Sequence, residues 1–389
     1  MKILYVLGPV FPGGATISFK IILDGILKNG HEAIVLVTKE ASIDEPMIQY
    51  MHKKGCIVER FLPEMFVFPK VNLIKWQDNI LKFPWRFIRM LINIYQSNKR
   101  VLYLAKKYQP HLIHTNIGVF RQGFYAAKKM RIPHLWHVRE YQTKDFGWHI
   151  LPSKKYYEQL LRKSFVICIT KEVLNYFKQN NNSQAITLWD GILSKRDLCF
   201  YPQKDNFFLC ANRVSPEKGL EDAIRAFSSA SKRLPAHNLL IVGTVQSNEY
   251  LKKLKLLIHS LGLTNRVEIK DHVENVTELM ARATALLVTS IFEGLGRMSL
   301  EATFKGCLVL GRNAGGTKEI IESTNGGFLF NNVNELSSLM VKTAHLSNSE
   351  AYTDIIYRAQ KVVLARCSNE NYCDKIKDIY NNIILHDRL

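Results

Sequence analysis

Cysteine is sparse in this chain of 389 residues: there are seven, with no C-x-x-C pair and no metal-site spacing with histidine. Several of them lie inside short apolar runs, a pattern typical of reduced core cysteines in a cytosolic protein rather than of a disulfide framework. The cysteines are Cys56, Cys168, Cys199, Cys210, Cys307, Cys367 and Cys373.

Long apolar runs are absent as well, since no stretch approaches the roughly 18 residues that a helix needs to cross a bilayer. The first residues, Met1–Gly8, already have the composition of a buried strand, so no signal peptide is expected there. The chain has no G-x-G-x-x-G fingerprint, and a nicotinamide cofactor is therefore not indicated. We expect a cytoplasmic protein.

Acidic residues are scarce in the first half of the chain. Residues 1–190 hold 28 Lys and Arg against 13 Asp and Glu, a net charge of +15 out of the +19 of the whole chain. Such an asymmetry indicates an anionic partner for the first half, either nucleic acid or an anionic membrane. No recognition motif of the common nucleic-acid-binding modules is present, so we expect no nucleic-acid partner.

Strand-like runs alternate with helical patterns throughout, which favours parallel sheets. We predict an α/β protein with two Rossmann-like, doubly wound domains, residues 1–198 and 199–371, because the length suits two domains. The predicted strands are Ile3–Leu7, Ala33–Val37, Cys56–Phe61, Leu112–Thr115, His134–His137, Val166–Ile169, Phe207–Cys210, Leu239–Val242, Val267–Ile269, Ala285–Val288 and Leu308–Leu310.

Two glutamates, Glu293 and Glu301, stand at the junction between a predicted strand and a predicted helix. Glu293 follows the apolar run Ala285–Val288, and Glu301 lies about one turn into the helix. Both side chains are expected to face the crevice where open α/β sheets bind ligands. Carboxylates there are good acceptors for the hydroxyl groups of a sugar or a ribose.

A second run with candidate chemistry, Ala211–Gly219, also follows a predicted strand and precedes a helix. Its two cations, Arg213 and Lys218, suit a diphosphate, because a cation near a helix N-terminus is unfavourable unless an anion lies there. Acceptors for hydroxyls together with cations for a diphosphate indicate a nucleotide-sugar site. No Asp-x-Asp pair follows a strand at this site, so no metal is expected.

These motifs resemble those of the family 4 glycosyltransferases, retaining sugar transferases of the GT-B fold. The resemblance also rests on the opening loop Gly8–Gly14, on His137–Glu140, and on Gly315–Ile321 after the glutamate pair. It implies two Rossmann-like domains that face a central cleft, with the acceptor site in residues 1–198 and the donor site in residues 199–371. It further implies that the last helix, within residues 372–389, packs back on the first domain.

The resemblance assigns a role to individual residues. It implies that Glu301 binds the ribose, that Glu293 lies near the donor sugar, and that His137 lies near the donor. The expected catalytic residues are Glu293, Arg213, Lys218 and His137. The expected donor-binding residues are Gly13, Gly14, Arg213, Lys218, Gly294, Leu295, Gly296, Glu301 and Thr317.

Two departures from the family pattern concern the donor. Lys270, Asp271 and His272 occupy the loop where the family usually has a glycine. Arg297 replaces an apolar residue of the family's motif and is expected to add a cation beside the sugar or the phosphate. The identity of the base and the donor sugar therefore stays open, with a UDP-sugar as the preferred donor.

The stretch from Phe61 to Lys107 is both aromatic and basic, the composition of an amphipathic helix at a membrane interface. In the resembled family the first domain often carries such a surface for docking on the cytoplasmic leaflet. The alternative is a pair of helices whose aromatic residues fill the core while their lysines face water.

We therefore predict a metal-independent, retaining glycosyltransferase, peripheral on the inner face of the cell membrane. It would move a sugar from a nucleotide sugar to a membrane-associated glycan or a lipid-linked acceptor in the synthesis of cell-envelope polysaccharide. One alternative is a transferase with a soluble acceptor such as a sugar phosphate. Others are a non-catalytic nucleotide-sugar-binding subunit and a basic Rossmann protein that binds nucleotides or nucleic acid.

Overall fold

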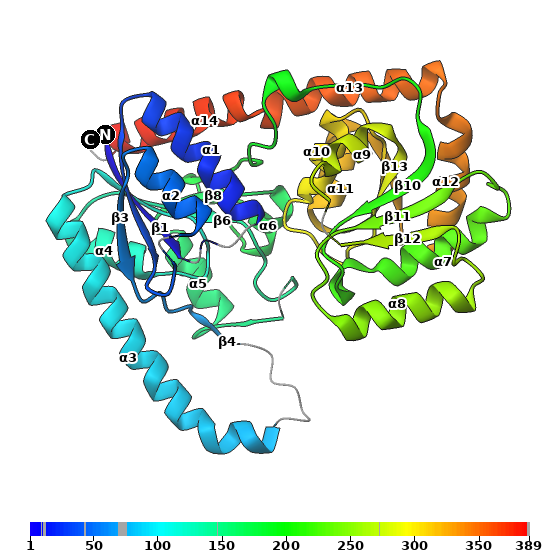
Figure 1. The fold of residues 1–389 in the computed structure, drawn as a ribbon. Coiled ribbons are helices and arrows are strands. Elements are labelled where there is room, and N and C mark those ends of the chain that lie inside the picture. The colour runs from blue at the N-terminus through cyan, green and yellow to red at the C-terminus, as the bar shows by residue number, and fades with distance from the viewer. Residues whose placement is uncertain are drawn as a thin grey trace. The chain divides into compact units, whose positions relative to one another are not determined.

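The structure is a computed structural model that describes residues 1–8, 10, 13–42, 44–68, 76–145, 147–271 and 273–386. The chain divides into two compact units (Figure 1). Unit 1 comprises Met1–Asp190 and Tyr372–Leu389, and unit 2 comprises Gly191–Asn371. Each unit is built on its own parallel sheet with helices on both faces, as an α/β fold requires.

The main sheet of unit 1 has the strand order β3-β2-β1-β5-β6-β8-β9, and every neighbouring pair is parallel. Its central strands are buried along their length, because helices cover both faces. The strands are β1 (Lys2–Gly8), β2 (Glu32–Thr38), β3 (Ile57–Phe61), β5 (Leu112–Thr115), β6 (His134–Val138), β8 (Phe165–Cys168) and β9 (Ala185–Thr187).

Helices pack on the two faces of this sheet in two apolar clusters. One cluster joins β1 and β2 to α1, α2 and α14, and the other joins them to α3 and α4. A short antiparallel pair, β4 (Val67–Phe68) and β7 (His149–Ile150), lies outside the main sheet. The helices are α1 (Gly14–Lys28), α2 (Pro46–Lys53), α3 (Trp76–Tyr108), α4 (Gln122–Met130), α5 (Lys154–Leu161), α6 (Lys171–Tyr176) and α14 (Asn369–His386).

The last helix, α14, returns to unit 1 after the chain has formed unit 2. Its buried residues Tyr372, Ile376, Tyr380 and Ile383 recur at helical spacing and pack with α1 and β1. The hydroxyl groups of Tyr5 and Tyr380 lie 3.2 Å apart in this core. The carboxyl-terminal helix is therefore part of the hydrophobic core of unit 1.

The sheet of unit 2 has the order β12-β11-β10-β13-β14-β15 and is also parallel. Its strands are β10 (Asp205–Ala211), β11 (Asn238–Val242), β12 (Val267–Lys270), β13 (Ala283–Val288), β14 (Val309–Arg312) and β15 (Gly327–Phe330). Its helices are α7 (Leu220–Ser231), α8 (Asn248–Ser260), α9 (Val276–Arg282), α10 (Arg297–Phe304), α11 (Gly315–Thr324), α12 (Val333–Leu346) and α13 (Glu350–Cys367).

The strand order of unit 2 reverses beside β10. From β10 the chain moves outward to β11 and β12, and then returns to place β13 on the other side of β10. The loops that follow β10 and β13 therefore leave the carboxyl edge of the sheet in opposite directions. In α/β sheets such a reversal opens the crevice in which ligands bind.

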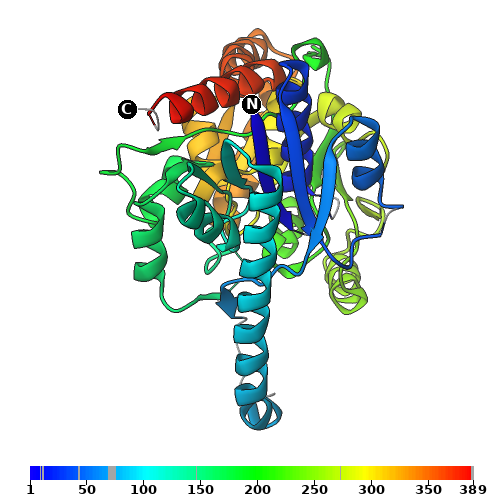
Figure 2. The same cartoon turned by 90° about the vertical axis from the view of Figure 1, so that its left-hand side faces the viewer.

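The helix α3 differs from the others in its packing within unit 1. Its carboxyl-terminal half is buried at Ser97, Val101, Leu104 and Ala105. Its amino-terminal half extends away from the sheet of unit 1 in both views (Figures 1 and 2). Over the described residues, no helix combines the length and apolar composition needed to cross a membrane.

The first segment of unit 1 ends at Asp190, which forms a buried ion pair with Arg139. The Nη1 group of Arg139 bonds both carboxylate oxygens of Asp190, and both side chains are 5% exposed. Asp190 also accepts hydrogen bonds from Ser18 Oγ at 2.7 Å and from Tyr372 OH at 3.1 Å. Asp190, the last residue before unit 2, and Tyr372, the first residue after it, therefore belong to one buried polar cluster.

Removing one partner of a buried ion pair leaves an uncompensated charge in the core. We therefore expect Asp190→Ala to lower the free energy of unfolding by about 3–5 kcal/mol in a urea titration. As a control, Glu32→Ala removes an exposed pair with Lys2 at 3.7 Å and should cost less than about 1 kcal/mol. Equal costs for the two substitutions would contradict the structural role of Asp190.

Candidate donor site and its supporting network

The loop after β10 is brought against the end of β13 by a close backbone approach at Gly219. This glycine has φ +62°, and a Cβ atom on it would lie 2.4 Å from the carbonyl oxygen of Thr289. The hydroxyl of Thr289 also donates to the carbonyl of Lys218 at 2.8 Å. The two predicted motifs therefore lie next to each other where the strand order reverses, because they follow the neighbouring strands β10 and β13.

Lys218 and Glu293 form an ion pair across this junction, although 75 residues separate them in the chain. The distance from Lys218 Nζ to Glu293 Oε1 is 2.7 Å, and the side chains are 12% and 20% exposed. The pair is therefore partly open to solvent and to a ligand at the carboxyl edge of the sheet.

Arg213 lies on the same loop and is exposed. Burial opposes ionisation of the nearby Glu217, but a hydrogen bond from Ser215 and the charges of Arg213 and Lys218 lower the pKa of that carboxyl below its usual value. The loop therefore places the cations Arg213 and Lys218 beside the carboxyl of Glu217 at the carboxyl edge of the sheet.

Glu301 lies on the first turns of α10 and forms an ion pair with Arg297. The distance from Arg297 Nε to Glu301 Oε1 is 2.8 Å, and the side chains are 14% and 13% exposed. Burial raises the pKa of Glu301, and the charge of Arg297 opposes that shift. The guanidinium of Arg297 bonds Glu301 and main-chain carbonyls, and its place beside a sugar or phosphate stays a prediction.

The turn with Gly294, Leu295 and Gly296 packs against the start of α11. The amide of Gly316 donates to the carbonyl of Glu293 at 2.8 Å, and a Cβ atom on Gly316 would lie 2.5 Å from Leu295 O. Gly296 is left-handed, with φ +77°. Thr317 is buried beside this turn, and its hydroxyl has no hydrogen-bond partner among the described residues.

The opening loop of unit 1 is described in part, because Pro9, Phe11 and Pro12 lie outside the described residues. Gly13 caps α1 and Gly14 is its first residue. A Cβ atom on Gly13 would meet nothing within 4 Å. The two glycines thus stand at a helix N-terminus, which is the position expected for amides that bind an anion.

His137 lies at the end of β6 and is fully buried. Burial, together with the charge of Arg139 and the neighbouring His114, holds the pKa of His137 well below its ordinary value. Arg139 Nη2 donates to His137 Nδ1 at 3.1 Å, so the ring is neutral and its proton is on Nε2. Its catalytic role stays a prediction, and in the structure the ring faces a polar core.

Two members of this polar core could not be found from the sequence. Asp190 lies in a turn-rich linker, and Tyr372 lies in the last helix, far from any motif. Arg139, part of a motif, bonds Asp190 and also donates to Asn116 O at 3.2 Å. Long-range partners of this kind leave no local pattern in a single sequence.

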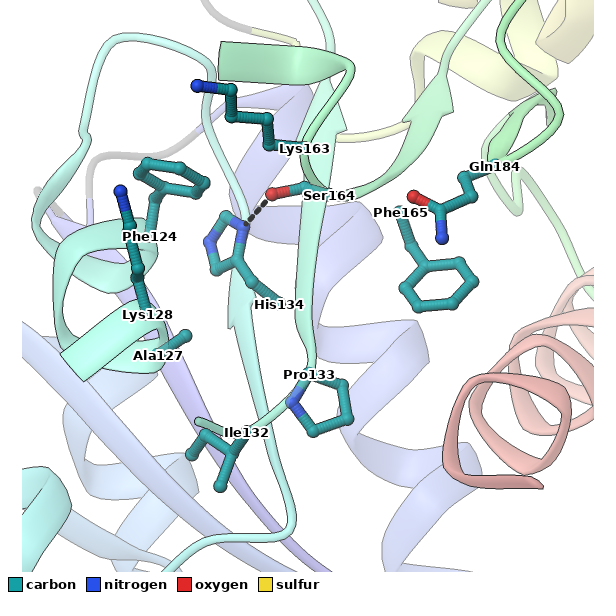
Figure 3. Close-up of a pocket in the computed structure, with 10 residues that line it drawn as sticks. All are labelled: Phe124, Ala127, Lys128, Ile132, Pro133, His134, Lys163, Ser164, Phe165 and Gln184. Atoms are coloured by element: carbon teal, nitrogen blue, oxygen red, sulfur yellow. Dashed lines mark hydrogen bonds between the residues drawn. The ribbon is translucent and has the colours of Figure 1, made fainter. Parts of the chain in front are cut away.

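The structure also has a cavity of about 280 Å³ in unit 1, at the amino ends of β6, β8 and β9 (Figure 3). His134 in its wall bonds Ser164 Oγ at 3.0 Å and Thr115 Oγ1 at 2.9 Å, so both ring nitrogens have protein partners. Ligands of α/β sheets bind at the carboxyl ends of strands. The candidate site therefore lies elsewhere, at the loops after β10 and β13.

The described residues contain no group of three or more His, Cys, Asp or Glu side chains that could hold a metal ion. The cationic side chains at this edge of the sheet, Arg213 and Lys218, belong to the loop after β10.

Residues 200–362 match the model of the family described as glycosyl transferases group 1. This part of the chain therefore carries a glycosyl transferases group 1 domain. The match spans most of unit 2, including both loops of the candidate donor site. The described fold agrees with this assignment, because each unit is Rossmann-like.

Similar proteins include an uncharacterized glycosyltransferase of Methanocaldococcus jannaschii, 22% identical over 77% of this chain and 82% of that protein. The poly(glycerol-phosphate) alpha-glucosyltransferase of Bacillus subtilis is 26% identical over 49% of this chain and 29% of its own length. The crystal structure of Anabaena HepE in complex with UDP-glucose has a TM-score of 0.74 and 20% identity, covering 98% of this chain and 100% of that one. The last similarity confirms the predicted two-domain GT-B fold class.

Glu140 lies just after β6, at the carboxyl edge of the sheet of unit 1. Its raised pKa predicts how the stability of the protein depends on pH. Burial, with a smaller effect of Asp145, raises the pKa of Glu140 from 4.5 to about 8. Folding therefore favours the protonated carboxyl, and stability should fall as pH rises from about 4.5 to about 8, by up to about 1.4 kcal/mol per pH unit. Glu140→Gln should flatten this slope in urea titrations, whereas Glu172→Gln, at an exposed position, should leave it unchanged.

Proposed function

We propose that this glycosyltransferase moves a sugar from a UDP-sugar to its acceptor without a metal ion and with retention of the anomeric configuration. The observation that carries the proposal is the Lys218–Glu293 pair of 2.7 Å, at the switch point where the loops after β10 and β13 meet. The crystal structure of Anabaena HepE in complex with UDP-glucose supports the choice of donor.

In this proposal the two cations neutralise the leaving diphosphate. Arg213 is exposed at the loop after β10, and Lys218 lies on the same loop. Each such contact contributes on the order of 3 kcal/mol to the transition state. Glu293 accepts hydroxyl groups of the donor sugar and is held in place by Lys218. Glu301 accepts the ribose hydroxyls through its carboxylate.

Retention follows a front-face route in the proposal. The bond between the anomeric carbon and the leaving phosphate oxygen breaks as the acceptor oxygen bonds the same face of that carbon. The leaving phosphate takes the proton of the acceptor hydroxyl. Lys218 and Arg213 stabilise the negative charge that develops on the phosphate, so the chain itself need not supply a base.

For the acceptor, we propose a membrane-associated glycan or lipid-linked molecule at the cytoplasmic face of an anionic membrane. The support is the amino-terminal half of α3, where apolar side chains are exposed at helical spacing. These are Trp85 (77%), Ile88 (48%), Leu91 (48%), Ile92 (50%) and Tyr95 (59%). A stripe of this kind beside basic residues is typical of a helix that lies in a membrane interface.

Basic residues flank this stripe. Arg89, Lys99 and Arg100 are exposed on the same helix, and Lys99 Nζ lies 4.6 Å from the ring centre of Tyr95. Lys70 and Lys75, which the sequence also places in this surface, lie outside the described residues. A soluble acceptor such as a sugar phosphate is the alternative, and the vesicle experiment below separates the two.

The donor assignment predicts that UDP stabilises the protein in the presence of EDTA. At 100 times its dissociation constant, UDP should add about 2.7 kcal/mol of stability, observed as a raised melting temperature. Glu301→Gln keeps the size of the side chain and loses the charge, so UDP affinity should fall roughly tenfold.

The control is Glu322→Gln, an exposed position on α11 that pairs with Lys318 at 3.9 Å, and it should bind UDP like the wild type. Loss of UDP binding on addition of EDTA would exclude the metal-free donor site. Wild-type affinity in Glu301→Gln would exclude the ribose assignment.

The acceptor assignment predicts that the protein sediments with anionic phosphatidylserine vesicles and much less with neutral ones. Each Lys or Arg near anionic lipid contributes about 1 kcal/mol, and raising the salt from 0.1 M to 1 M shortens the Debye length from about 10 Å to 3 Å. Replacing Trp85, Ile88 and Ile92 by serine should release the protein while UDP still binds. Equal sedimentation of this variant and the wild type would contradict a docking role for α3.

A further inference from the structure

Arg297 bonds the carboxylate of Glu301 and two carbonyls of the segment that connects the units. Its Nε group bonds Glu301 Oε1 at 2.8 Å. Its Nη1 and Nη2 groups donate to the carbonyls of Gly191 at 3.2 Å and Ile192 at 3.1 Å. One side chain therefore links the candidate ribose acceptor to the first residues of unit 2.

The connecting segment is itself paired with the segment by which the chain returns. Ile192 N donates to Cys367 O at 3.0 Å, and Asn369 N donates to Leu193 O at 2.9 Å. Leu193 and Ser368 form an isolated parallel bridge. The residues by which the chain enters unit 2 are thus paired with the residues by which it leaves unit 2. Arg297 bonds the first of these residues, Gly191 and Ile192.

The chemistry of arginine suits this arrangement. The guanidinium is planar and carries five donors in fixed directions, so it bonds a carboxylate and two carbonyls at the same time. Lysine has one compact charged group and cannot reproduce this geometry. In the sequence, Arg297 stands where the motif of the resembled family has an apolar residue.

A ligand at Glu301 and the guanidinium of Arg297 bond the same carboxylate. A ribose hydroxyl that donates to Glu301 would compete with Arg297 for the negative charge of the same carboxylate. The strength of the bonds from Arg297 to the two carbonyls therefore depends on whether the carboxylate is occupied. By linkage, an interaction at the connecting segment changes the affinity for the nucleotide by the same factor.

We propose that Arg297 is a positioning residue: it orients Glu301 for a nucleoside diphosphate and couples the occupancy of Glu301 to the order of the paired connecting segment. The part that concerns the nucleotide rests on the proposed function of Glu301. The part that concerns the connecting segment stands on the hydrogen bonds of Arg297, Ile192 and Asn369.

Hydrogen exchange read by mass spectrometry tests both parts on the full chain, in the peptides that contain Ile192 and Asn369. In the absence of nucleotide, Arg297→Leu should raise exchange at these two amides about tenfold over the wild type. Arg297→Lys should give a similar increase, because charge alone does not hold the two carbonyls. UDP should change exchange at these amides in the wild type and leave it unchanged in Arg297→Leu.

The matched control is Arg282→Leu, which removes another arginine of unit 2, one paired with Asp205 at 2.6 Å. It should exchange like the wild type at Ile192 and Asn369. That result would show that loss of an arginine elsewhere in unit 2 does not raise exchange at these two amides. Wild-type exchange in both Arg297 variants would overturn the proposal, as would a UDP response that persists in Arg297→Leu.

The two possible failures are distinguishable. If UDP does not bind the wild type, the proposed donor is wrong, but the comparison of Arg297→Leu with the wild type in the absence of nucleotide still decides whether Arg297 holds the segment. If UDP binds and its affinity falls about tenfold in Arg297→Leu, the orienting role at Glu301 is supported. Unchanged UDP affinity in that variant would overturn it.

Discussion

The parallel pairing of β10 with β13 is the constraint on which the candidate donor site of unit 2 depends. Parallel neighbours need a long crossover, so two loops far apart in the chain leave the same edge of the sheet. The approach of Gly219 to Thr289 O then has no room for a side chain, and the loop after β10 is held against the end of β13. This close backbone approach brings the two motifs together at one edge of the sheet.

The two carboxylates of the candidate site, Glu293 and Glu301, are each paired with a cation. The two pairs differ in their position and in their further contacts. Glu293 is paired with Lys218 at the open edge of the sheet, where both side chains are partly exposed. Glu301 is paired with Arg297 on its own helix, and its pKa is raised by burial against the charge of that arginine. The first pair belongs to the loops that would meet a donor, whereas the second connects the site to the main chain at Gly191 and Ile192.

The central strands could be predicted from the sequence because a buried parallel strand reads as a continuous apolar run. Ala285–Val288 lies inside β13, and Phe207–Cys210 lies inside β10. The edge strands β9 and β15 were missed, since both are short and only partly buried. The positions of Glu293 and Glu301 relative to strand and helix followed from the local pattern. The partners of Arg297 and the cluster around Asp190 did not, because those contacts join residues distant in the chain.

Composition could locate the basic aromatic stretch but could not say which of its residues pack inside. The structure divides α3 into a half that is buried at Val101 and Leu104 and a half that exposes Trp85, Ile88 and Ile92. Covering a large apolar side chain completely contributes about 1.5–3 kcal/mol. Trp85, Ile88 and Ile92 are 77%, 48% and 50% exposed, so each of them forgoes part of that contribution. An exposed stripe of this size is retained at a cost in stability, and an interfacial environment that accepts apolar and cationic groups together would offset that cost.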